Sequence, residues 1–180
     1  IIAFAILKQK FQNLKLILKD QSNLYDKKAE EYLDMIKTTK YGKYLNIDVI
    51  NDIIFISKNL DLISLNRLYN LTDCYVSPYR AEGFNLPPLE AAAVGTPIIV
   101  TKGGSTDDYF HPSLGLQIDS VQFEKNDSRK VEPKMDSLIE CIEKIILNPN
   151  NFGQIKGSQF IQNNYNWKII TNQLYKVFNE

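Results

Sequence analysis

The sequence predicts an α/β fold, a doubly wound parallel sheet of the Rossmann-like type. Short apolar runs that suit buried strands alternate with helical patterns along all 180 residues. This alternation is typical of parallel strands joined by right-handed helical crossovers, and it places the ligand-binding edge at the carboxyl ends of the strands. No internal repeat or low-complexity tract interrupts the pattern.

Elements in the first part of the chain are assigned from the spacing of apolar residues. Helices are expected where such residues recur every three or four positions, over 4–11, 29–36 and 64–68. Strands are expected where they run together, over 14–18 and 53–56. Ser64 suits the N-cap of the third helix, because its hydroxyl can accept a bond from a free backbone N–H.

The same alternation continues in the second part of the chain. Strands are expected over 74–77, 97–101 and 114–118, and helices over 87–94, 138–146, 152–160 and 167–178. Pro149 ends one of these helices, because the residue before a proline avoids the helical conformation. Residues 119–132 are mostly polar and have no clear period, which predicts an exposed loop.

The composition suits one soluble globular domain, with 44% hydrophobic and 23% charged residues. Lys plus Arg equals Asp plus Glu at 21 each, so no global charge favours nucleic acid or an anionic membrane. No apolar stretch approaches the roughly 20 residues that span a bilayer, and no signal peptide pattern opens the chain. We therefore expect a cytoplasmic protein, and leave open peripheral membrane association of the full-length protein.

Two further features concern the cysteines and the start of the chain. Cys74 and Cys141 fall in an expected strand and an expected helix, which favours buried thiols over a disulfide or a metal pair. Buried thiols suit a reducing compartment. The chain opens at Ile1 inside a helical pattern without a cap, which indicates a piece of a longer protein.

The most informative stretch, residues 80–95, places Glu82 and Glu90 around a loop that opens into a helix. Pro87 suits the first helical turn, where a missing N–H costs nothing, and the loop follows a strand. Free helical N–H groups at such a strand end attract phosphate. Glu90, expected in the first helical turn, can bind vicinal hydroxyls such as those of a ribose. Two acids framing a diphosphate site suit a nucleotide-linked sugar.

At these residues the chain resembles the retaining family 4 (group 1) glycosyltransferases, which have the GT-B fold. Their signature is two glutamates separated by seven residues in a Glu-Gly-Phe-Gly-Leu-Pro-x-Leu-Glu-Ala context, and Glu82 and Glu90 have this spacing. The flanks 68–78 and 95–104 are similar too, and the resemblance spans nearly the whole chain. Asn85 stands where the family usually has glycine. Because asparagine is the substitute that best tolerates positive φ, we expect the loop shape to survive.

The resemblance implies that residues 1–180 are the C-terminal, donor-binding half of a GT-B enzyme, truncated at its N-terminus and without its acceptor domain. It implies a metal-independent hexosyltransferase that uses a UDP-, GDP- or ADP-sugar and no cofactor. The isolated chain should be inactive, because the cleft needs both halves. Glu82 would contact the transferred sugar and stabilise positive charge at its anomeric carbon, and Glu90 would bind the ribose. The donor-binding loop implied by the resemblance comprises Gly83, Phe84, Asn85 and Leu86, with backbone N–H groups directed at the sugar and the distal phosphate.

The same glutamates have simpler interpretations, and weaker candidates surround them. Glu82 can equally be a solvated loop residue, and Glu90 can serve the helix dipole. Lys58 and Asn59 end a strand where the resemblance implies main-chain contacts to the nucleobase, although alone they indicate a polar turn. The remaining candidates are two cations that follow strands, either of which could reach a diphosphate or simply be solvated, namely Arg80 and Lys19.

An aromatic residue, a glycine pair and a histidine are further candidates for contacts with a ligand or for catalysis. The ring of Phe84 is expected in the core and not against a ligand. Gly103 and Gly104, with the two aspartates that follow, fit either a loop near the acceptor or a turn before a capped helix. His111 is the only histidine, and the proline after it favours a surface turn over a catalytic base.

Other classes of protein lack their motifs in this sequence. Gly-x-Gly-x-x-Gly and Gly-x-x-x-x-Gly-Lys-[Ser/Thr] do not occur, which disfavours a dehydrogenase or a P-loop nucleotidase. Asp-x-Asp is also missing, which disfavours a metal-dependent glycosyltransferase. Two alternatives to the enzyme stay open: a non-catalytic nucleotide-sugar-binding module, and a structural partner domain whose helix around Trp167 and Phe178 docks on a neighbour. The sequence leaves the nucleobase, sugar and acceptor open.

Overall fold

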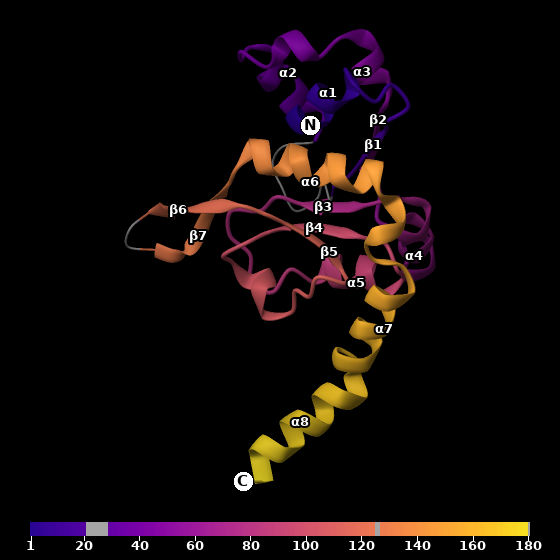
Figure 1. Cartoon of the computed structure of the whole chain (residues 1–180), viewed down its shortest axis with the longest axis vertical. Helices are drawn as coiled ribbons and strands as arrows, with labels where there is room; N and C mark the ends of the chain where they lie inside the picture. The colour runs from indigo at the N-terminus through magenta and orange to yellow at the C-terminus, as the bar shows by residue number, and fades with distance from the viewer. Residues whose placement is uncertain (21–28, 125–126, 180) are drawn as a thin grey trace. The chain divides into compact units, whose positions relative to one another are not determined.

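The computed structural model describes residues 1–20, 29–124 and 127–179. These residues form two compact units, Ile1–Asp61 and Leu62–Glu180 (Figure 1). Parallel strands alternate with helices in each unit, so the predicted α/β fold is confirmed.

The amino-terminal unit is built around a two-stranded parallel sheet. Lys19, the last residue of one strand, lies opposite Ile56, the last residue of the other, so both strands end at one edge. The side chains of Phe4, Leu33 and Val49 pack in its core. Its elements are α1 (Ile2–Lys8), β1 (Leu16–Lys19), α2 (Glu31–Lys37), the 3-10 turn η1 (Gly42–Tyr44), α3 (Ile47–Asn51) and β2 (Ile53–Ile56).

The second unit contains a three-stranded parallel sheet in the order β3-β4-β5, with Ser77, Val100 and Gln117 in register. Helix α5 lies on one face of this sheet and α6 on the other (Figure 1). Its elements are α4 (Leu62–Leu71), β3 (Tyr75–Ser77), α5 (Leu86–Ala93), β4 (Ile98–Thr101), η2 (Ser105–Asp108), β5 (Gly115–Ile118), β6 (Ser120–Glu124), β7 (Asp127–Pro133), α6 (Met135–Leu147), η3 (Pro149–Asn151), α7 (Gln154–Asn164) and α8 (Trp167–Asn179).

The core of this unit lies between the sheet and α5. Every residue of β4 is buried, as expected for the central strand of a parallel sheet covered on both faces. Ile98 and Val100 of this strand meet Leu89 of α5 and the ring of Tyr109. The strands come so close that a Cβ atom on Gly115 would lie 1.9 Å from the carbonyl oxygen of Ile98. Glycine is therefore required at this position by the neighbouring backbone.

The prediction of an exposed loop over 119–132 is wrong. Within this segment β6 and β7 pair as an antiparallel hairpin, with Val121 opposite Glu132 and Gln122 opposite Val131. Most of these residues are polar, and the described valines differ in burial: Val131 is almost fully buried, whereas Val121 is half exposed. A strand shows alternating apolar residues in its sequence where every second side chain is buried. The described residues of this hairpin show that alternation only in part.

Other boundaries differ from the expectation in smaller ways. Helix α4 begins at Leu62, two residues before the expected cap, so Ser64 lies inside the helix. Between the first two strands, η1 and α3 were not predicted from the sequence. The described parallel strands form a two-stranded and a three-stranded sheet instead of one hydrogen-bonded sheet. The thiols of Cys74 and Cys141 are free, as predicted.

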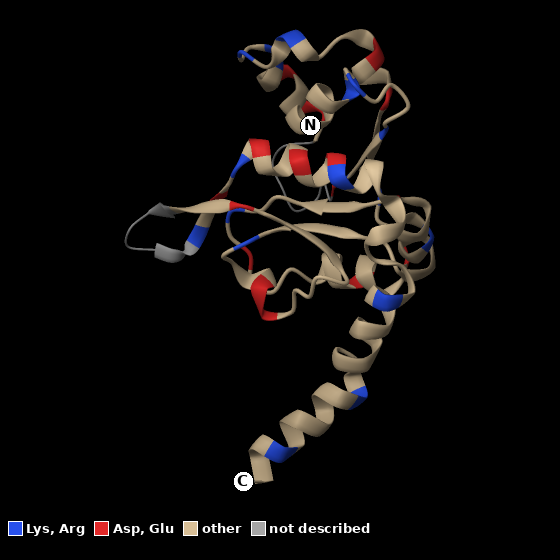
Figure 2. Cartoon of the chain, in the orientation of Figure 1, with Lys and Arg blue, Asp and Glu red and all other residues tan. Residues whose placement is uncertain are grey.

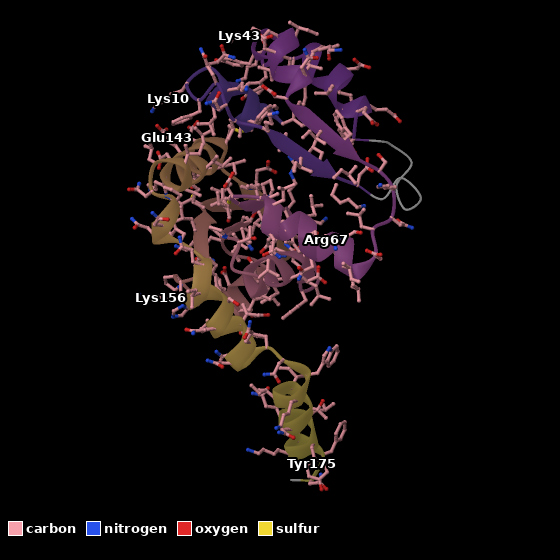
Figure 3. All side chains as sticks on the ribbon, turned by 90° about the vertical axis from the view of Figure 1, so that its right-hand side faces the viewer. Lys10, Lys43, Arg67, Glu143, Lys156 and Tyr175 are labelled. Carbon is pink, nitrogen blue, oxygen red and sulfur yellow. The ribbon has the colours of Figure 1, made fainter. Side chains whose placement is uncertain are left out.

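Helix α8 is amphipathic and has no buried residue. Its apolar side chains include Trp167, which is 87% exposed, and Tyr175, labelled in Figure 3. It carries Lys168 and Lys176 and no acidic residue within 167–179, whereas α6 carries both signs (Figure 2). The docking of this helix on a neighbour stays a prediction. No helix in the described part of the chain combines the length and the apolar character needed to cross a membrane.

Replacing two glycines by alanine should show that the fold requires glycine at position 115 and tolerates a side chain at position 83. Gly115→Ala should lower the free energy of unfolding by about 2 kcal/mol or more, because the new methyl group clashes with the backbone of β4. Gly83→Ala is the matched control, since a Cβ there would meet nothing within 4 Å. It should change stability by no more than about 0.5 kcal/mol. Urea denaturation of both variants measures the difference, and equal stability would contradict the packing of Gly115.

Candidate functional site

The loop that carries the two-glutamate motif leaves the carboxyl end of β3, as the sequence predicts. Because β3, β4 and β5 are parallel and in register, the segments after Ser77, Thr101 and Ile118 all leave the same edge of the sheet. This edge is where ligands bind in parallel α/β sheets. The loop spans residues 78–85, and we call it the motif loop.

The first end of the motif loop is fixed by Tyr79, whose side chain is buried. Its hydroxyl donates to the carbonyl oxygen of Thr101 at 3.1 Å and accepts from the backbone N–H of Thr106 at 3.1 Å. The hydroxyl of Thr101 donates in return to the carbonyl oxygen of Tyr79 at 3.0 Å. A Cβ atom on Gly104 would lie 2.7 Å from the Tyr79 oxygen, so glycine permits this close packing.

Arg80 forms a two-pronged ion pair with Glu132 of β7. Its Nε donates to Oε2 at 2.5 Å and its Nη2 to Oε1 at 2.9 Å. The hydrogen bond and charge of Arg80 lower the pKa of Glu132, and those of Glu132 raise the pKa of Arg80. The backbone N–H of Val131 also donates to the carbonyl oxygen of Arg80, at 2.8 Å. Binding of a phosphate by Arg80 stays a prediction, and its guanidinium already holds a carboxylate of its own chain.

The other end of the motif loop is fixed at Asn85, which has the left-handed conformation with φ 61° and ψ 68°. The prediction that asparagine replaces glycine in a positive-φ backbone is therefore confirmed. Asn85 Nδ2 donates to Ser77 Oγ at 2.9 Å, and its carbonyl oxygen accepts from the hydroxyl of Tyr109 at 2.9 Å. Tyr109 is 1% exposed, and its burial raises the pKa of that hydroxyl. The turn into α5 is thus tied to the core.

Between these two ends the chain from Ala81 to Phe84 is exposed. The backbone N–H groups of Gly83, Phe84, Asn85 and Leu86 donate to no partner among the described residues. Pro87 and Pro88 follow as the second and third residues of α5 and have no N–H of their own, so the sequence interpretation of the helix start is confirmed. The free N–H groups at the start of α5 can therefore donate hydrogen bonds to an anionic ligand.

The expectation that the ring of Phe84 lies in the core is wrong. The ring is 41% exposed and rests against Tyr109, with 5.3 Å between the ring centroids. Tyr109 occupies the core position beneath it, so Phe84 covers the buried tyrosine from the solvent side. Its exposed face lies on the motif loop beside the free amides.

Glu90 lies just beyond the first turn of α5, because the helix begins at Leu86, before both prolines. This corrects the expectation of a first-turn position. Its Oε2 accepts from the hydroxyl of Tyr69 at 2.9 Å. Burial and this hydrogen bond raise the pKa of Tyr69. The Tyr69 hydroxyl therefore orients one carboxylate oxygen, while the Glu90 residue itself is exposed.

The two motif glutamates act electrostatically on one tyrosine. Burial, and after it the charges of Glu90 and Glu82, raise the pKa of Tyr75 to about 12. Both carboxylates are exposed, so neither is turned into the core. That the two acids border one part of the surface stays a prediction of the motif spacing.

A family model described as "Glycosyl transferases group 1" matches residues 1–167. The chain belongs to this family. A putative glycosyltransferase 63 of Sulfolobus islandicus filamentous virus is 32% identical over 115 residues, which is 61% of this chain and 38% of that protein. The uncharacterized protein 356 of Sulfolobus islandicus rod-shaped virus 1 is 30% identical over 116 residues, 62% of this chain and 32% of that protein. The matches thus span about a third of the length of each relative.

Two solved structures share the fold of this chain. Sucrose-phosphate synthase from Thermosynechococcus elongatus superimposes with a TM-score of 0.69 at 20% identity, over 98% of this chain and 41% of that one. The C-terminal domain of a glycosyl transferase group 1 family protein from Francisella tularensis gives a TM-score of 0.63 at 19% identity, over 92% of this chain and 77% of that one. The α/β architecture is therefore that of the C-terminal half of a GT-B glycosyltransferase.

The remaining residues predicted from the sequence lie in the first unit or have structural roles. Lys19 ends β1, and Lys58 and Asn59 follow β2, so they leave one edge of the two-stranded sheet. Their part in donor binding stays a prediction. In the second unit, Asp107 accepts from the N–H of Gly103 at 2.9 Å, which supports the interpretation of that segment as a turn.

Neither His111 nor a cluster of acidic side chains forms a catalytic or metal-binding group in the described part of the chain. His111 is exposed, bonds through Nδ1 to Ser113 Oγ at 2.8 Å and stacks on Phe160, as suits a surface turn. No group of three His, Cys, Asp or Glu side chains is arranged to hold a metal ion in residues 1–20, 29–124 and 127–179. Metal independence stays a prediction of the resemblance.

The supporting residues of the site were not identified from the sequence. Tyr79, Tyr109 and Tyr69 each donate a hydroxyl that fixes part of the motif, and Glu132 binds Arg80 from the hairpin. Tyr109 lies 24 positions from the residue whose carbonyl it holds, and no spacing rule links such partners. Only packing of the folded chain brings them together.

Substitutions at Asn85 should test the left-handed turn. Asn85→Ala should destabilise the protein more than Asn85→Gly by about 1 kcal/mol, because only glycine has no steric penalty at positive φ. Both variants lose the bond to Ser77, so their difference isolates the backbone conformation. Thermal or urea unfolding measures it. An alanine variant as stable as the glycine variant would refute the assigned conformation.

Proposed function

We propose that this chain is the donor-nucleotide domain of a retaining, metal-independent glycosyltransferase, which moves a hexose from a UDP-, GDP- or ADP-sugar to an acceptor. The observation that carries the proposal is the row of free amides from Gly83 to Leu86 at the start of α5, which exposed Glu82 precedes and exposed Glu90 follows in the chain. The family of the chain supplies the reaction class. We place the acceptor domain in the longer protein, and the enzyme in the cytoplasm.

The free amides would stabilise the departing nucleoside diphosphate. As the bond to the sugar breaks, negative charge grows on the distal phosphate, and fixed N–H dipoles stabilise such charge without reorganising. The positive end of the α5 dipole adds to this effect. Because the motif loop is held at Tyr79 and Asn85, its amides are preorganised before the donor binds. No nucleophile of the protein is needed if a phosphate oxygen of the leaving group takes the acceptor proton.

The two glutamates would serve different parts of the donor. Glu82 lies next to the free amides, so its carboxylate suits the sugar, where it stabilises positive charge at the anomeric carbon. Glu90, whose second oxygen is oriented by Tyr69, suits the vicinal hydroxyls of the ribose. Lys58 and Asn59 would contact the nucleobase, and Lys19 would contact the diphosphate.

Nucleotide binding is the first test. Calorimetric titration of the chain with UDP, GDP and ADP should give saturable heat for at least one of them at millimolar concentration. Gly83→Ala should weaken that binding about tenfold, because it adds a methyl group in open space at the first of the free amides, and hydrogen bonds to charged groups are worth about 1.5–3 kcal/mol. The absence of heat for all three nucleotides would refute the donor site. Binding without transfer by the longer protein would favour a non-catalytic module.

Turnover is the second test, in the longer protein that we expect to contain this chain. Glu82→Gln should lower kcat about 100-fold, because a carboxylate that stabilises the transition state loses its charge. Glu140→Gln, on the exposed side of α6, is the control and should leave kcat unchanged. Near-normal turnover of the Glu82 variant would refute its catalytic role while leaving donor binding intact.

A further inference from the structure

The β6–β7 hairpin begins at the same edge of the sheet as the motif loop. Ser120, its first residue, donates from Oγ to the carbonyl oxygen of Lys102 at 2.6 Å, directly after β4. A Cβ atom on Gly103 would lie 3.7 Å from Cγ1 of Val131, so the buried valine of β7 packs on the same turn. The base of the hairpin is therefore attached to the segment that follows the central strand.

The hairpin is also attached to the motif loop, through two consecutive residues of β7. The N–H of Val131 donates to the carbonyl oxygen of Arg80, and Glu132 accepts from two nitrogens of the Arg80 side chain. Backbone and side chain of Arg80 are thus held by one strand. A planar guanidinium paired with both oxygens of a carboxylate fixes orientation as well as distance.

This attachment matters because Glu82 and Gly83 lie in the exposed stretch of the loop, where a Cβ on Gly83 would touch nothing. The ring of Phe84 packs on Tyr109 at the far side of this stretch. The position of Glu82 and Gly83 consequently depends on how the residues on either side of them are held. Asn85 is tied to the core by Tyr109, whereas the other end is fixed by Tyr79 and by the hairpin partners of Arg80.

We propose that Glu132 is a positioning residue, which holds Arg80 and thereby orients Glu82 and the free amides of the motif loop for the donor. Arg80 then acts as an anchor of the loop and not as a phosphate ligand. The Arg80 side chain is 67% exposed and that of Glu132 36%, so their pair is screened by solvent, contributes little to folding stability and acts on geometry. This inference rests on the donor-binding function proposed above and names a residue outside the two-glutamate motif.

Exchanging the charges of Arg80 and Glu132 distinguishes the two possible roles of Arg80, which are holding the loop and binding phosphate. Glu132→Gln should weaken binding of the nucleoside diphosphate about three- to tenfold, a loss typical of a broken charged hydrogen bond. Arg80→Glu, which places two carboxylates side by side, should weaken it further. The double variant R80E/E132R restores the pair with its charges exchanged and should bind within about twofold of the unmodified protein. If Arg80 instead holds phosphate, Glu132→Gln will bind as well or better and the double variant will stay weak, which overturns the proposal.

A second measurement needs no ligand. Backbone 15N relaxation of Gly83 and Phe84 should show lower order parameters in Glu132→Gln and recovery in R80E/E132R, with Glu140→Gln as a control that changes nothing. Unchanged order in Glu132→Gln overturns the positioning role, as does lower order with unchanged nucleotide binding. Failure of the unmodified protein to bind any nucleotide refutes the donor function instead, and the relaxation data still decide whether Glu132 orders the loop.

Discussion

The carbonyl oxygen of Asn85, held by the hydroxyl of buried Tyr109, is the constraint on which the site depends. At this residue the chain turns from an exposed loop into a helix through a left-handed conformation. Such a conformation costs about 1–2 kcal/mol for a residue other than glycine, so it persists only where the surroundings hold it. Tyr109 belongs to the core beneath α5. Because its hydroxyl bonds to Asn85, the free amides beside Asn85 are held in a fixed position relative to the core. Without that bond, the direction of α5 and of its dipole would be less defined.

In the motif loop, some residues hold the backbone in place and others leave their N–H groups free for a ligand. Its ends, at Tyr79 and Asn85, have buried polar partners, while the segment between them exposes its backbone. A backbone N–H that is already bonded cannot stabilise a ligand, and an unsupported loop does not keep its amides in place. Anchoring the ends and leaving the middle free satisfies both requirements. This division explains why the residues that shape the site are tyrosines outside the motif.

Most of the fold and the location of the site could be predicted from the sequence. Strands such as 53–56 are short apolar runs, and the periodic helix at 138–146 ends where Pro149 requires, so local patterns specify them. The positive φ of Asn85 agrees with the resemblance, in which glycine is usual at this position and asparagine is its best-tolerated substitute. The hairpin was missed because most of its residues are polar, and buried Val131 with half-exposed Val121 leaves no clear period. The partners of the site were missed because contacts such as that of Tyr109 join distant positions, which only tertiary packing decides.

Charge balance in the second unit bears on how a diphosphate can be held there. Glu82 and Glu90 add negative charge beside the free amides, and the positive charge of Arg80 is neutralised by Glu132. The amides and dipole of α5 correspond to roughly half a positive charge, which is less than a diphosphate carries. The proposed donor therefore needs cations in addition to these groups. We expect lysines that follow strands, together with basic residues of the proposed acceptor domain, to supply them, which makes donor affinity strongly dependent on ionic strength.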